Sequence, residues 1–120
     1  SKEGELQALK IGKFFKENDI NFTKVISSEW CRCKDTAKIA FGNYETKNFL
    51  NSFYDERFSE NKDKQILDFQ KFIKNWNYSG NLALVTHYVV ISEILDLATS
   101  SGEIVITDNN LKFLGSLEIN

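Results

Sequence analysis

The chain has 120 residues, of which 42% are hydrophobic and 27% charged, and fifteen Lys and Arg against seventeen Asp and Glu give a net charge of −2. This balance predicts one globular domain over residues 1–120, with a core that needs no disulfide or metal. The slightly acidic charge argues against general nucleic-acid binding, and no apolar run reaches the roughly 18 residues of a membrane span.

The first part of the chain predicts a helix, a strand and a second helix. Residues 3–18 have the apolar spacing of an amphipathic helix, and 22–27 are short and β-branched, as is typical of a strand. Ser27–Ser28 offers an N-cap for a helix that runs to about Phe41. The stretch 43–62 mixes polar and aromatic residues without a period, so it predicts an irregular insertion.

The second part predicts two further helices and three strands. Helical spacing returns over 63–78, and 82–86 is a continuous apolar run of the kind found in strands buried on both faces. A helix is expected over 89–98, followed by strands over 103–107 and 111–119 that can form a hairpin. The order predicts an α/β fold with a mostly parallel sheet flanked by helices and an antiparallel edge at the C-terminal end.

Two cysteines, Cys31 and Cys33, are separated by one residue, which is too close for an ordinary disulfide. A zinc site needs about four ligands, and the single His of the chain does not complete such a set. The pair therefore predicts two small thiols, buried or half-buried, and no metal site.

The chemistry is expected where the parallel strands end, because ligands of open parallel sheets bind beyond their carboxyl ends. The first strand ends at Ser27–Ser28, with Arg32 near the start of the next helix, and the apolar run 82–86 is followed at once by His87. An arginine, a histidine and two helix N-termini would then meet at one rim. This set of groups favours an oxyanion, with phosphate as the expected ligand.

Each of these residues also has an ordinary structural interpretation. A single His often serves only in packing, and an Arg on a helix is often simply solvated. Glu103 can be either a turn residue or a carboxylate that faces the site. The acids of the insertion read as solvated charges, and their spacing selects none of them as a general acid: Glu45, Asp55, Glu56 and Glu60.

Four segments, in the same order, resemble motifs of the histidine phosphatase superfamily, the phosphoglycerate-mutase-like proteins. Residues 1–8 (SKEGELQA) resemble its Leu-Ser-x-x-Gly-x-x-Gln-Ala segment, and 26–37 (ISSEWCRCKDTA) its Ser-Ser-x-x-x-Arg-x-x-x-Thr-Ala block. Residues 84–87 (LVTH) resemble its second histidine motif, and 101–105 (SGEIV) a Gly-Glu strand start. The Cys before the Arg and the Ser-Gly-Glu start are most similar to a small bacterial branch that includes lipopolysaccharide heptose-phosphate phosphatases.

The resemblance implies that phosphate is held between two His and two Arg, without metal or cofactor. It assigns phosphate binding to Arg32 and both a catalytic and a phosphate-binding role to His87. The nucleophilic His and the other Arg belong to an Arg-His-Gly motif at the end of the family's first strand. An acidic residue protonates the leaving oxygen, and the substrate is a small-molecule or sugar phosphate.

The chain departs from the family pattern, since it contains no Arg-His-Gly and no Met. We therefore expect that sequence upstream of Ser1 carries this motif and the first strand. Without that strand, the 120 residues should leave a gap between strands with an exposed apolar groove, and should be inactive alone. His87 is followed by Tyr88, where the acid-phosphatase branch has Asp, so the general acid is not assigned.

These observations support a phosphomonoester hydrolase that acts through a phosphohistidine intermediate. The alternative is a non-catalytic module that binds phosphate or a partner and has lost its nucleophile, and a third is an unrelated α/β module. Sugar phosphate, phosphoprotein and lipid-linked phosphate all stay open as substrates. The compartment stays open between the bacterial cytoplasm and periplasm, and the sequence predicts no oligomeric state.

Overall fold

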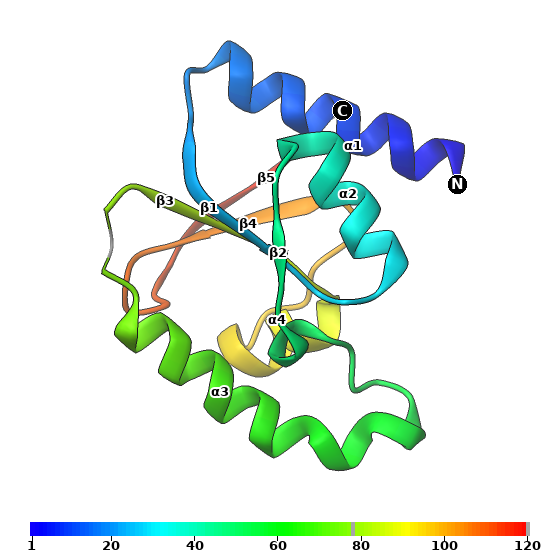
Figure 1. Ribbon diagram of the computed structural model, residues 1–120, viewed down its shortest axis with the longest axis vertical. Helices are drawn as coiled ribbons and strands as arrows, with labels where there is room; N and C mark the ends of the chain where they lie inside the picture. Colours follow the sequence, from blue (N-terminus) through cyan, green and yellow to red (C-terminus); the bar gives the residue numbers. More distant parts are fainter. Residues whose placement is uncertain (78, 120) are drawn as a thin grey trace.

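The computed structural model describes residues 1–77 and 79–119 (Figure 1). None of the helices in these ranges is long and apolar enough to cross a membrane. The helices and strands follow one another as α1 (Lys2–Glu17), β1 (Phe22–Ser27), α2 (Cys31–Phe41), β2 (Glu45–Thr46), η1 (Asn48–Leu50), η2 (Glu56–Asn61), α3 (Lys62–Asn75), β3 (Asn81–Val85), α4 (Tyr88–Leu95), β4 (Glu103–Thr107) and β5 (Phe113–Glu118).

The first helix begins where the sequence supplies a cap. The Ser1 hydroxyl accepts a hydrogen bond from the Gly4 N–H at 3.1 Å, and the acidic residues of the first turn favour the positive helix end. Ala8 and Ile11 are the buried residues of α1. A Cβ on Gly12 would lie 2.6 Å from the Ala40 carbonyl oxygen, so a glycine here lets α1 pack closely against α2.

Strand β1 is the centre of a three-stranded parallel sheet with the order β2-β1-β3. Its residues alternate between the two faces of the sheet, as a pleated strand requires. Ile26 belongs to a core that also contains residues of α3, α4 and η1, whereas Val25 packs with Ala37 of α2 and Ala83 of β3. Figure 1 shows α1 and α2 at the top and α3 at the bottom, with the sheet between them.

The last two strands form a hairpin of their own. β4 and β5 pair antiparallel, with Ile104 opposite Leu117, and they make up a separate two-stranded sheet. The expected antiparallel hairpin is present, but it is not the edge of the parallel sheet. In the described residues no backbone ladder joins β3 to β4.

Several element boundaries differ from the sequence-based expectation. The expected N-cap at Ser27–Ser28 is wrong, because α2 begins at Cys31 and the residue before it is Trp30, with an extended backbone. α4 ends at Leu95, since Asp96 adopts the left-handed conformation with a φ of 55°. The helix predicted over 63–78 ends at Asn75 in the structure, and Tyr78 lies outside the described residues.

Candidate functional site

The ends of β1 and β3 bring a serine and the histidine of the chain into contact. The two strands are parallel neighbours in which Ser27 pairs with Val85, so the residues that follow them leave the sheet at the same rim. Ser28 and His87 are both buried there, and the Ser28 Oγ lies 2.9 Å from the His87 Nε2. The sequence placed these residues at one rim, and the structure puts their side chains in hydrogen-bond contact.

A hydrogen-bond network that reaches from the buried Ser28 to the exposed Glu29 fixes the roles of the serine hydroxyl as donor and acceptor. Asn51 accepts the Glu29 N–H on Oδ1 at 2.8 Å and donates from Nδ2 to the Glu29 carboxylate at 2.9 Å, which fixes the orientation of its amide. The Ser28 hydroxyl donates to the same Oδ1 at 3.1 Å and accepts the Trp30 N–H at 3.2 Å. Because this hydroxyl has one proton, the network favours a His87 imidazole that carries its proton on Nε2 and donates it to Ser28.

The imidazole of His87 is also held by its other neighbours. Its Nε2 lies 3.6 Å from the Cys33 Sγ, and the Trp30 ring packs edge-on with the ring centres 4.9 Å apart. The Cys33 thiol donates to the Thr86 carbonyl at 3.6 Å, and the Thr86 hydroxyl donates to the Leu50 carbonyl at 2.6 Å. With only 6% of its surface exposed, the His87 ring is fixed in one position.

Burial sets the protonation states of the two titratable groups in this network. It lowers the pKa of His87 to about 4, and the positive charge of Arg32 acts in the same direction. Burial also raises the pKa of the Cys33 thiol, although the hydrogen bond with Ser28 and the Arg32 charge partly oppose this. At neutral pH the site therefore contains a neutral imidazole and a protonated thiol.

Arg32 supplies positive charge at the entrance to this rim. Its side chain is exposed in the first turn of α2, with its guanidinium carbon 5.8 Å from the centre of the Trp30 ring. Helices α2 and α4 both begin at the rim, and neither has a side-chain cap or an acidic residue in its first turn. Two positive helix ends and a guanidinium can thus stabilise an anion here.

Other candidates from the sequence lie elsewhere or are already paired. The Glu103 carboxylate accepts the Ser100 N–H at 3.1 Å in the turn before β4, which favours its interpretation as a turn residue. Asp55 is bound by Arg57, whose side chain holds the pKa of that carboxyl below its usual value. Of the two cysteines, Cys33 is buried as predicted, whereas Cys31 is exposed.

The sequence argument missed the network partners of His87. Asn51 lies in the irregular insertion, and no period or motif distinguishes it from the other asparagines there. Trp30 had no signal of its own beyond its position between Ser28 and Arg32. The position of Cys33, five residues after Ser28, which follows β1, was a weak indication that it lies near the site.

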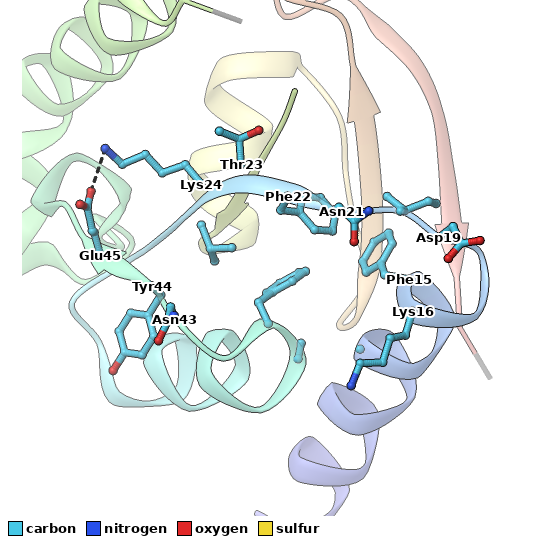
Figure 2. Close-up of a pocket in the computed structure, with 15 residues that line it drawn as sticks. Phe15, Lys16, Asp19, Asn21, Phe22, Thr23, Lys24, Asn43, Tyr44 and Glu45 are labelled. Atoms are coloured by element: carbon cyan, nitrogen blue, oxygen red, sulfur yellow. Dashed lines mark ion pairs between the residues drawn. The ribbon is translucent and has the colours of Figure 1, made fainter. Parts of the chain in front are cut away.

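A pocket of about 770 Å³ lies at the other end of β1. It is lined by residues of α1, α2 and the first half of β1, and Figure 2 shows Lys24 and Glu45 pointing toward each other at its edge. Their ion pair measures 3.1 Å. Phe22, the first residue of β1, lines this pocket, whereas Ser27 ends the strand at the rim, so the pocket is separate from the His87 site.

The chain was compared with known proteins. No family model and no curated protein matches it. Solved structures do match: TTHB049 from Thermus thermophilus has a TM-score of 0.70 and 17% identity over 98% of this chain and 84% of that chain. A phosphoglycerate mutase from the same organism has a TM-score of 0.67 and 18% identity over 100% of this chain and 84% of that chain.

At these identities the similarity shows the fold. The chain has an α/β fold of the phosphoglycerate mutase type, with a parallel three-stranded sheet flanked by helices. The expected fold class is therefore confirmed.

Proposed function

We propose that this protein is a phosphomonoester hydrolase of the histidine phosphatase type, in which His87 and Arg32 hold the phosphoryl group. One observation carries this proposal. The neutral, buried imidazole of His87 lies at the same rim as the exposed guanidinium of Arg32 and the N-terminal ends of α2 and α4, which have no side-chain cap. All of these groups stabilise negative charge on oxygen, which is what phosphoryl transfer requires. The phosphoglycerate-mutase-type fold supports the same conclusion.

The proposed reaction has two steps. A histidine nitrogen attacks phosphorus while the ester P–O bond breaks, and the leaving oxygen takes a proton from an acidic group. Water then attacks the phosphohistidine, the P–N bond breaks, and inorganic phosphate leaves. In both steps Arg32 and His87 stabilise the charge on the phosphoryl oxygens, and the reaction needs no metal ion.

The attacking histidine is proposed to belong to a segment that precedes Ser1. The chain contains one His, and its Nε2 is engaged by Ser28. The break between β3 and β4 supports this proposal, because a further strand paired with β3 would end at the same rim as His87 if it ran parallel. In this proposal residues 1–120 form most of one domain and are inactive alone.

Phosphate binding to the 120-residue chain is the first test. We expect inorganic phosphate to raise the midpoint of thermal unfolding, as any ligand that binds only the folded state does. Arg32→Gln should weaken phosphate binding by about tenfold or more, the usual value of a charge-assisted hydrogen bond. Lys13→Gln removes the same charge from the exposed face of α1 and serves as the matched control. Equal affinity in both variants would remove Arg32 from the site.

Turnover by the full-length chain is the second test. We expect the gene to encode Arg-His-Gly a short distance before Ser1, and the full-length protein to hydrolyse p-nitrophenyl phosphate. His87→Ala should reduce kcat by about a hundredfold or more if the imidazole stabilises the transition state. Phosphate binding without turnover, together with a gene that lacks the motif, would instead support the non-catalytic phosphate-binding module.

A further inference from the structure

Four aromatic side chains form two pairs near His87, and one of these pairs contacts the imidazole through Trp30. We call Trp30, Tyr54, Phe58 and Tyr88 the aromatic collar. The ring centres of Trp30 and Phe58 are 6.0 Å apart, and those of Tyr54 and Tyr88 are also 6.0 Å apart. The insertion between β2 and α3 thus supplies one ring to each pair.

The collar is continuous with the proposed phosphate site. The Trp30 ring packs against His87 with the ring centres 4.9 Å apart, and Tyr88 directly follows His87 at the start of α4. Tyr54 lies three residues after Asn51, which anchors the insertion to the loop after β1 through Ser28. A ligand that places a phosphoryl group beside His87 would therefore extend its remaining atoms toward these rings.

The two tyrosines of the collar are exposed, whereas Trp30 and Phe58 are half-buried. Tyr54 is 73% exposed and Tyr88 is 55% exposed, although both are large aromatic side chains. Exposed aromatic pairs beside a polar site are typical of ligand-binding surfaces, because a ligand can bury them at little conformational cost.

Two polar side chains near the collar, those of Arg57 and Asn51, are already engaged within the protein. The Arg57 guanidinium stacks on Phe58 at 5.3 Å but forms a bidentate pair with Asp55, at 3.1 Å and 3.0 Å. The amide of Asn51 is taken by Glu29. Apart from the phenol hydroxyls of Tyr54 and Tyr88, the collar therefore offers flat aromatic faces to a ligand.

We propose that the aromatic collar binds an aromatic leaving group, so that the substrates of this protein are aryl phosphomonoesters. This inference rests on the proposed function, because it needs a phosphoryl group held beside His87. An aryl ring gains offset or edge-to-face contacts with Tyr54, Tyr88 and the Trp30–Phe58 pair, and a methyl group in its place cannot make these contacts.

The test compares two phosphonates that are not hydrolysed, so it needs no nucleophile. Phenylphosphonate and methylphosphonate share the anionic group and differ in the ring. Binding is measured by fluorescence in the Trp76→Phe variant, in which Trp30 is the remaining tryptophan. We expect phenylphosphonate to bind about tenfold more tightly than methylphosphonate.

The collar variant is Tyr54→Ala combined with Tyr88→Ala, both at exposed positions where the fold should tolerate the change. We expect it to lower the phenyl-to-methyl affinity ratio to near one. The matched control is Leu67→Ala, which truncates a side chain 66% exposed on α3 and should leave the ratio unchanged.

The possible outcomes separate the two proposals. If inorganic phosphate and methylphosphonate bind but phenylphosphonate gains nothing, the collar inference is overturned and the proposed function stands. The same holds if the double variant keeps the full ratio. If neither phosphate nor either phosphonate binds, both proposals are overturned.

Discussion

Acidification should destabilise this protein through its single histidine. The pKa of His87 is about 4 in the folded chain and about 6.5 in an unfolded one. Between these two values the unfolded chain binds a proton that the folded chain excludes. The free energy of unfolding therefore falls as the pH drops below about 6.5, and this loss is complete only below the folded pKa near 4.

The size of the effect follows from the difference between the two pKa values. Linkage gives a total of about 3 kcal/mol, of which about 2 kcal/mol should be lost between about pH 7 and about pH 5. That is a large share of the roughly 5–15 kcal/mol by which domains are stable. The buried position of the ring, 6% exposed, makes the full value a reasonable upper limit.

The assay is urea unfolding followed by tryptophan fluorescence at the two pH values. His87→Gln is the control, because glutamine stays neutral while every carboxylate is kept. Asp55 and Asp108 also have lowered pKa values, but these groups act mainly below about pH 4. We expect the variant to lose less than about a quarter of the wild-type difference over this range.

The pKa of His87 in the folded chain can also be measured directly by NMR titration. The chain has one imidazole, so its signals are unambiguous. A folded pKa near 6.5, or equal pH dependence in wild type and His87→Gln, would refute the reasoning. Either result would mean that water reaches the ring and that burial does not keep it neutral.

Three further predictions concern packing and the buried network. Gly12→Ala should cost about 1–3 kcal/mol by urea unfolding, because the new Cβ meets a backbone carbonyl of α2, whereas Gly4→Ala should be neutral or stabilising. A thiol reagent should modify the exposed Cys31 in the folded chain and reach the buried Cys33 only after unfolding, as mass spectrometry of the modified peptides would reveal. Ser28→Ala should lower the free energy of unfolding by about 1–3 kcal/mol, because it leaves the buried imidazole without its acceptor; an unchanged value would contradict this.

The rim of the site could be predicted from the sequence because two strong local signals define it. The strand before Ser28 is short and β-branched, the one before His87 is a continuous apolar run, and parallel pairing places their carboxyl ends together. Although 59 residues separate Ser28 from His87, the prediction needed only the strand ends and the direction of pairing. The fold class followed from the same alternation of strands and helices.

The network around His87 could not be predicted, because it depends on tertiary contacts of the insertion. Asn51 acts through its amide orientation, which Glu29 fixes from another part of the chain. The same contacts explain the wrong N-cap, since the Ser28 hydroxyl is used by the imidazole and by Asn51 instead of a first helical turn. β2 could not be predicted because its two residues have no strand-like pattern of their own and are defined as a strand by their pairing with β1.

If the proposed function holds, phosphate binding and the protonation of His87 are coupled. Burial and the positive charge of Arg32 both lower the pKa of His87. A phosphate anion bound beside this imidazole would oppose both effects and raise the same pKa. The affinity for phosphate should then change with pH between the free and bound pKa values of His87, beyond the change due to the titration of phosphate itself. The burial that costs stability in acid would thus link the charge of the imidazole to the proposed ligand.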